Sequence, residues 1–284
     1  MDRTIDNGAG RPPASTRPAP RRAWLDGRLA GATLQAGGML QLAGQAFWRG
    51  FRPPYDYGPE LVEQLRFALR ISLFPLVLTA FALSFGPAGI QASNFLGLFG
   101  ALDRLGGVYV IVVIREFAPL VTAIVVAGVA GTAICADLGA RRVREEIDAL
   151  EVLGIDTVRA LVVPRLFAIV IVCVLFDVFA LLAGVLGAVL VVVQNHAPVG
   201  PFFSTFFSSA TTLELAASFV KCAIYGVMIA IVCCYKGINA SGGAAGVGRA
   251  VNQSVVVAFL ATGAINYVFT QLLLATNPIL SEVR

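Results

Sequence analysis

Charged residues and histidine are scarce in this chain. Only 13% of its 284 residues are Asp, Glu, Lys or Arg, and 57% are hydrophobic. A soluble protein carries about 25% charged residues. The low charge therefore excludes a soluble globular protein and predicts an integral membrane protein. The single histidine, His196, lies in a predicted outer loop, which argues against a catalytic centre based on histidine.

Two further absences bear on chemistry. No Gly-x-x-x-x-Gly-Lys-Ser/Thr run is present, so we expect the chain to hydrolyse no ATP by itself and to hold no cofactor. Its five cysteines fall in or beside apolar segments without the spacing of a metal site: Cys135, Cys173, Cys222, Cys233 and Cys234. We expect no metal and interpret the cysteines as small apolar residues in helix packing.

The first 59 residues differ from the rest. Residues 1–22 are rich in Pro and Arg, which predicts a disordered basic tail. Residues 23–59 mix tryptophans with Gly, Gln and Arg, which is too polar for a span and indicates an interfacial amphipathic segment. Residues 60–284 form the membrane domain.

Five apolar segments are each long enough to cross a bilayer, which takes about 20 residues. We expect an all-α protein with spans at about 67–90, 112–136, 163–193, 215–235 and 250–274. A stripe of small residues in the second span suits close helix packing: Ala127, Gly128, Gly131, Thr132 and Cys135. Residues 91–104 are expected to form a loop or short re-entrant piece, and residues 194–214 an outer loop.

Lys and Arg are unevenly divided between the two ends of these spans. Segments 1–60, 137–165 and 236–249 hold fifteen of them, whereas the segments at the other ends hold two. The positive-inside rule then predicts a multi-pass protein of the plasma (inner) membrane with a cytoplasmic N-terminus and an outer C-terminus.

The most heavily charged stretch lies between spans two and three. Residues 140–153 read as an amphipathic cytoplasmic helix with Val143, Ile147 and Leu150 on one face. Its arginines precede its acids, an order that opposes the helix dipole. The order suits arginines that fix the cytoplasmic end and acids that meet a basic partner. A solvated loop helix without a partner fits the spacing equally well.

Four charges lie within or near spans: Arg115, Glu116, Asp177 and Lys221. A charge in hydrocarbon costs about 2.5–3.5 kcal/mol on insertion scales, so such residues usually face a partner or a cavity. Asp177 and Lys221 lie on consecutive spans and are expected to form an ion pair, either structural or lining a substrate path. The sequence Phe117-Ala-Pro119 indicates a local helix irregularity after Arg115 and Glu116.

A glycine-rich run, Ser241–Arg249, superficially matches a dinucleotide fingerprint. It follows a membrane helix rather than a strand, so we interpret it as a cytoplasmic turn. The turn glycines are Gly242, Gly243, Gly246 and Gly248.

Several motifs together resemble one family. They are Arg-Glu-Phe-Ala-Pro at 115–119, Ala-Asp-Leu-Gly at 136–139, Glu-Glu-Ile-Asp-Ala-Leu-Glu-Val-Leu-Gly at 145–154, Leu-Val-Val-Pro-Arg at 161–165 and the glycine run at 242–249. In this order they resemble the MlaE/YrbE family, the permease subunits of Mla and Mce lipid ABC transporters. Residues 133–141 and 251–259 are most similar to A-type YrbE permeases of actinobacterial Mce systems.

The resemblance implies partners and sites. It implies a permease subunit of an ATP-driven transporter of fatty acids, sterols or phospholipids. The partners would be a second YrbE-type permease in a heterodimer, a cytoplasmic ATPase dimer that binds ATP and Mg, and outer Mce-domain tunnel proteins, with no nucleic acid. The helix between spans two and three would contact the ATPase through Arg141, Arg144, Glu145, Glu146, Asp148, Leu150 and Glu151. Arg115, Glu116 and Pro119 would lie at the substrate pocket or gate.

Two alternatives remain open from the sequence. One is an ion-coupled secondary transporter that uses Asp177 and Lys221 as a relay. The other is a membrane subunit that anchors other proteins and transports nothing.

Overall fold

The computed structural model describes residues 21–53 and 57–277. The predicted basic tail at 1–22 lies outside these residues, except for the last two, which begin the first helix. The chain divides into two compact units, Met1–Gly38 and Met39–Arg284. The second unit contains all of the candidate membrane spans.

Helix α1 (Arg21–Gly50) runs from the first unit into the second. Within the second unit, Ala46 is buried and Gly50 packs against Phe167, so closely that a Cβ at Gly50 would lie 2.7 Å from the ring. The Tyr57 hydroxyl donates a hydrogen bond to the Gly50 carbonyl at 2.8 Å. The end of the predicted interfacial segment is therefore helical and fixed to the membrane domain.

Five helical runs in the described part are long and apolar enough to cross a membrane. They are Gly58–Leu98, Leu102–Val143, Val158–Gln194, Thr212–Ile238 and Gly243–Thr276. The predicted all-α architecture with five spans is confirmed. The runs are longer than the predicted spans. The second run has 42 residues, which correspond to a helix about 60 Å long, twice the roughly 30 Å thickness of the hydrocarbon layer.

Most runs contain more than one helix. The first comprises α2 (Gly58–Leu83), the π-helix η1 (Ser84–Ile90) and α3 (Gln91–Leu98). The second comprises η2 (Leu102–Arg104), α4 (Leu105–Tyr109), the π-helix η3 (Val110–Phe117), α5 (Ala118–Val126), the π-helix η4 (Ala127–Gly131) and α6 (Thr132–Val143). The third comprises the π-helix η5 (Val158–Val162) and α8 (Val163–Gln194). The fourth is α10 (Thr212–Ile238) and the fifth α11 (Gly243–Thr276).

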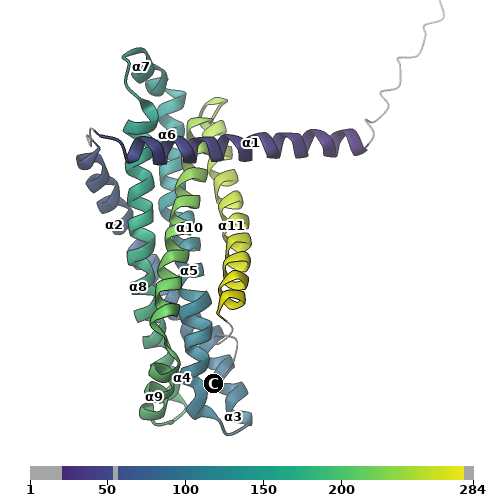
Figure 1. Cartoon of the computed structure of the whole chain (residues 1–284), viewed down its shortest axis with the longest axis vertical. Coiled ribbons are helices and arrows are strands. Elements are labelled where there is room, and N and C mark those ends of the chain that lie inside the picture. Colours follow the sequence, from purple (N-terminus) through teal and green to yellow (C-terminus); the bar gives the residue numbers. More distant parts are fainter. Residues whose placement is uncertain (1–20, 54–56, 278–284) are drawn as a thin grey trace, which may run out of the picture. The chain divides into compact units, whose positions relative to one another are not determined.

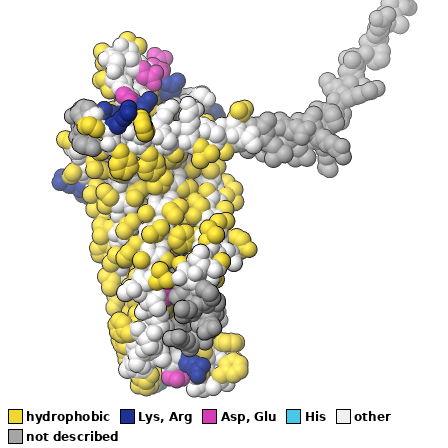
Figure 2. All heavy atoms as spheres, viewed as in Figure 1, with side chains coloured by type: hydrophobic (Ala, Val, Ile, Leu, Met, Phe, Trp, Pro, Cys, Tyr) yellow, Lys and Arg dark blue, Asp and Glu magenta, His cyan; other side chains and the backbone are white. Residues whose placement is uncertain are grey.

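Short helices occupy the two ends of the bundle. Helix α7 (Glu146–Val152) lies at one end, and α3, α4 and α9 (Val199–Ser209) lie at the other (Figure 1). Hydrophobic side chains cover the flank between them, with charged side chains gathered at the ends (Figure 2). The predicted outer loop at 194–214 is thus partly wrong, since α9 folds within it, and α3 occupies much of the segment at 91–104 that was expected to be a loop or short re-entrant piece.

Small residues bring the helices into close contact. A Cβ at Gly131 of η4 would lie 2.8 Å from the Cys233 sulfur, and one at Gly237 would lie 2.9 Å from the Cys135 carbonyl. Close packing by the stripe of the second span is therefore confirmed at Gly131 and Cys135. All five cysteines are buried and free, as their interpretation as packing residues requires.

The glycine-rich turn is shorter than predicted. Only residues 239–242 separate α10 from α11, and Gly242 and Gly243 have φ angles of 87° and 66°. Gly246 and Gly248 lie in the first turns of α11 instead. A Cβ at Gly246 would lie 1.8 Å from the Ser241 carbonyl oxygen, so the chain reversal needs glycine there.

Candidate functional site

The charged stretch between spans two and three is broken into two helices. Helix α6 ends at Val143, Glu145 adopts a left-handed φ of 61°, and α7 begins at Glu146. The predicted continuous helix over 140–153 is therefore wrong. The break also accounts for most of the charge order, because Arg141 and Arg142 lie in the last turn of α6 and Glu146 and Asp148 in the first turn of α7. Each group thus lies at the helix terminus that its charge stabilises.

Ion pairs connect the two helices across the break. Arg142 contacts Asp148, and Arg144 Nε lies 2.6 Å from Glu146 Oε1. The hydrogen bond from Arg144 lowers the pKa of the Glu146 carboxyl from its usual 4.5, and Glu146 raises the pKa of Arg144. The Glu146 carboxyl therefore carries its full negative charge at neutral pH.

Exposed apolar residues lie beside these acids. Val152 and Leu153 are 88% and 74% exposed, while Ile147 is buried and Leu150 half-buried. We call the exposed residues of this region the α7 surface: Glu145, Glu146, Asp148, Glu151, Val152 and Leu153. Apolar side chains exposed together in this way are typical of a protein contact site.

A second group of polar residues lies inside the bundle, where η3, α10 and α11 meet. Glu116 accepts hydrogen bonds from Thr270 Oγ1 at 2.8 Å, Asn266 Nδ2 at 2.8 Å and Lys221 Nζ at 3.3 Å. The Tyr225 hydroxyl donates to Asn266 Oδ1 at 2.7 Å. These five residues form the Glu116 cluster, in which a single carboxylate joins three helical segments.

Backbone geometry explains how Lys221 reaches this cluster. Pro119 has no N–H to donate to the carbonyl four residues earlier, which belongs to Arg115. Lys221 Nζ donates to that carbonyl at 3.0 Å. The π-helix η3 widens the chain at the same place, as the predicted irregularity at 117–119 requires.

The ion pair expected between Asp177 and Lys221 is wrong. Lys221 is 2% exposed and pairs with Glu116, whereas Asp177 Oδ2 accepts a hydrogen bond from Ser218 at 2.7 Å. Ser218 and Lys221 are three residues apart on α10, so their side chains point about 60° apart around the helix. Ser218 faces Asp177 on α8, and Lys221 is turned toward η3 and α11.

Arg115 has a separate partner on α10. Its guanidinium lies 2.5 Å from Glu214, and both side chains are nearly buried. Glu214 and Thr211 form the capping box that starts α10. Arg115 therefore fixes η3 to the first turn of α10.

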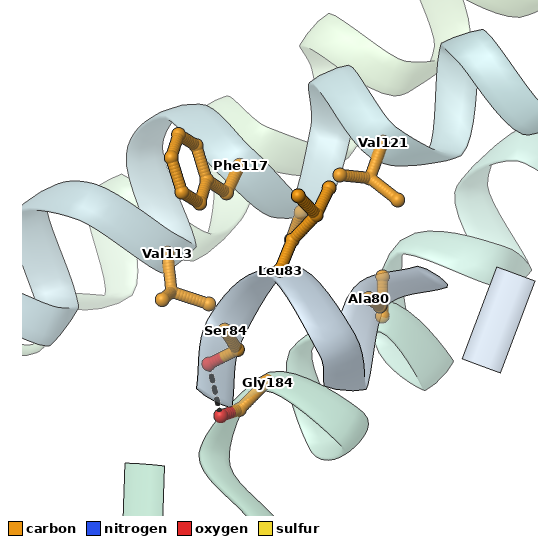
Figure 3. A pocket seen from close by; sticks show the side chains of 9 residues that line it. Ala80, Leu83, Ser84, Val113, Phe117, Val121 and Gly184 are labelled. Carbon is orange, nitrogen blue, oxygen red and sulfur yellow. Dashed lines mark hydrogen bonds between the residues drawn. The ribbon is translucent and has the colours of Figure 1, made fainter. Parts of the chain in front are cut away.

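An apolar hollow lies on the other side of this segment (Figure 3). It is small, with a volume of about 10 Å³, and is lined by Ala80, Leu83, Ser84, Val113, Phe117, Ala118, Val121, Ala180 and Gly184. Arg115, Glu116 and Pro119 do not line it, because successive helical residues turn by about 100°. Ser84 in its wall donates a hydrogen bond to the Gly184 carbonyl at 2.6 Å.

Sequence reasoning missed an ion pair near the α7 end. Arg165 at the start of α8 is 1% exposed, and its Nη2 lies 2.7 Å from Asp137 Oδ2 of α6. The available signal was a basic residue at the start of one span and an acidic residue at the end of the span before it. Sequence reasoning also missed Tyr225, Asn266 and Thr270, because an uncharged polar side chain in an apolar segment does not by itself indicate a site.

Comparison with known proteins identifies the family that these features share. The family model described as Permease MlaE matches residues 61–272. The chain belongs to the MlaE permease family. The resemblance predicted from the sequence motifs is thereby confirmed.

Curated relatives agree with this assignment. A "Probable ABC transporter permease protein" of Rickettsia bellii is 30% identical over 224 residues, covering 78% of this chain and 85% of the relative. A relative of the same description in Synechocystis is 34% identical over 185 residues, covering 65% and 70%. The chloroplastic protein TRIGALACTOSYLDIACYLGLYCEROL 1 of Arabidopsis thaliana is 30% identical over 165 residues, covering 57% and 46%. This chain is thus a multi-pass membrane permease of an ABC-type transporter, a class that works with a separate ATPase.

Proposed function

We propose that this permease moves lipids across or out of the membrane, using ATP hydrolysed by a cytoplasmic ATPase dimer that contacts the α7 surface. One observation carries the proposal. The α7 surface presents acids and exposed apolar residues at the end of two spans, and the break at Glu145 makes α7 a separate helix from α6. A basic, partly apolar groove on the ATPase would complement it.

The distribution of Lys and Arg supports a cytoplasmic location for α7. Many basic residues lie near this end of the chain's spans: Arg49, Arg52, Arg66, Arg70, Arg141, Arg142, Arg144, Arg159, Arg165, Lys236 and Arg249. We propose a plasma (inner) membrane location, with the N-terminus in the cytoplasm and the C-terminus outside. ATP and Mg would be bound by the ATPase and not by this chain.

Lipid is the cargo class that the residues around Phe117 and Glu116 favour. The hollow behind Phe117 is apolar, and the carboxylate of Glu116 lies one residue away in the chain with 29% of its side chain exposed. Apolar residues on one side of this segment and a partly exposed carboxylate on the other would suit a molecule with an apolar tail and a polar head, such as a fatty acid or phospholipid; a sterol is the third candidate. The Arabidopsis relative carries the name of a galactolipid, which favours the same class.

The remaining subunits follow from the motif resemblance. We propose a second YrbE-type permease as the membrane partner and outer Mce-domain proteins as the tunnel, with this chain as the A-type member of an actinobacterial Mce system. Closure of the ATPase dimer would push α7, and the spans around Arg115, Glu116 and Pro119 would open or close the substrate gate.

Charge reversal on α7 tests the ATPase contact. The double variant Glu146→Lys and Asp148→Lys should abolish co-purification of the ATPase while the permease stays folded. The matched control is Glu63→Lys, which reverses an exposed acid of α2. Unchanged co-purification of the ATPase with the α7 double variant would contradict the coupling assignment.

Mass spectrometry of the purified complex tests the cargo. We expect one lipid class to be enriched over its share of the surrounding membrane, and the enrichment to fall in Glu116→Gln. A bound lipid profile identical to the bulk membrane in both proteins would argue against a lipid site at this place.

A further inference from the structure

The ion pair between Arg165 and Asp137 joins the two spans that carry α7. Asp137 lies in α6, six residues before the helix ends, and Arg165 lies in the first turn of α8. Between them the chain leaves the bundle, forms α7 and returns through η5. The pair therefore closes the base of the α6–α7–α8 connection, although 28 residues separate its members.

The two residues differ in exposure. Arg165 is 1% exposed, whereas the Asp137 side chain is 43% exposed. Besides Asp137, Arg165 donates through Nη1 to the Leu161 carbonyl at 2.7 Å, and its Nη2 lies 3.9 Å from Glu60 of α2. Arg165 thus fixes the junction of η5 and α8 from inside the bundle.

Asp137 faces the α7 side of this arrangement. Its Oδ1 lies 3.2 Å from Arg141 Nε in the last turn of α6, and its Oδ2 contacts Arg165. One carboxylate therefore binds a residue beside the α7 connection and a residue inside the bundle. The carboxylate therefore connects the last turns of α6 directly to the first turn of α8.

From this geometry we propose that Asp137 and Arg165 are a positioning pair that makes α6 and α8 move as one body when the ATPase acts on α7. The inference rests on the proposed function, because it requires an ATPase that contacts α7. Without the pair, α6 would move while α8, held by its own apolar packing, would follow only in part.

Spin-label distances in the assembled complex test the pair. The five native cysteines are buried, so labels can be directed to introduced cysteines at Val143, in the last turn of α6, and Leu182, on the exposed face of α8. The distance is measured without nucleotide and with ATP trapped by vanadate. The variants are Asp137→Asn, Asp137→Glu as the conservative replacement, and Glu63→Gln as an exposed control.

We expect the Val143–Leu182 distance to stay the same in both nucleotide states for the wild type, Asp137→Glu and Glu63→Gln. In Asp137→Asn it should change by about 1–2 Å, the size of ordinary helix shifts at interfaces. The ATPase should co-purify with all four proteins, since the α7 surface is unaltered.

Two results would overturn the inference alone: a nucleotide-dependent distance in the wild type, or an unchanged distance in Asp137→Asn with the ATPase bound. A wild-type permease that does not bind the ATPase would overturn the proposed function, and the inference with it. Co-purification therefore separates the two failures.

Discussion

Replacing Lys221 with Met should destabilise the bundle by an amount that the Glu116 cluster allows us to work out. Lys221 is 2% exposed and contributes the only cation that the described contacts give to Glu116. Removing one member of a buried ion pair costs about 3–5 kcal/mol, because the other charge is left without a partner. Glu116 retains hydrogen bonds from Asn266 and Thr270 and is 29% exposed. These lower the expected cost to about 2–3 kcal/mol.

Thermal unfolding of the purified permease in detergent measures this cost. At about 2 °C per kcal/mol for a chain of this size, Lys221→Met should lower Tm by about 5 °C. Glu116→Gln should lower it at least as much, since it leaves Lys221 buried without a counter-charge. The double variant should recover most of the loss, because no charge then remains unpaired.

The control for this series is Arg66→Met, which removes an exposed cation of α2. If Lys221→Met unfolds at the same temperature as this control, the pair contributes no stability. If the double variant is no more stable than either single variant, the loss comes from packing and not from charge.

Further predictions concern the turn before α11 and the α7 surface. Gly246→Ala should destabilise the permease in the same unfolding assay, because its Cβ would overlap the Ser241 carbonyl, whereas Gly248→Ala has open space and should be neutral or slightly stabilising. Raising the salt concentration should weaken ATPase binding in a pull-down assay, because salt screens an electrostatic contact between exposed charges. Because Arg144 lowers the pKa of Glu146 below 4.5, its charge is present above that pKa and lost only as the pH falls through it. ATPase binding should therefore be the same at about pH 6 and about pH 8, and a fall over that range would place the titrating group elsewhere.

The spans and their packing could be predicted from the sequence because both depend on local composition. Apolar length alone gives five crossings, and the small residues Gly131 and Cys135 lie where α6 approaches α10. The helices α3 and α9 could not be predicted, because they fold in segments too polar or too interrupted to read as spans.

The candidate sites depend on how each helix is rotated about its axis and on partners far away in the chain. Neither can be predicted from local composition. Lys221 lies 105 residues from Glu116, and only the turn of α10 decides that it faces η3 and not Asp177. The break at Glu145 was foreshadowed by the charge order of 140–153, which is unfavourable for one helix and favourable for two. The same charge order therefore predicts two helices, with the second beginning at the acids.

Site-directed cross-linking tests the central claim, that α7 is where the ATPase acts on this permease. A cysteine at Val152, which is 88% exposed on α7, is compared with one at Leu98, which is 83% exposed at the opposite end of the bundle. In membranes containing both proteins, a bifunctional thiol–amine reagent should join Val152→Cys to the ATPase and leave Leu98→Cys unjoined. An ATPase adduct from Leu98→Cys, with none from Val152→Cys, would contradict the account.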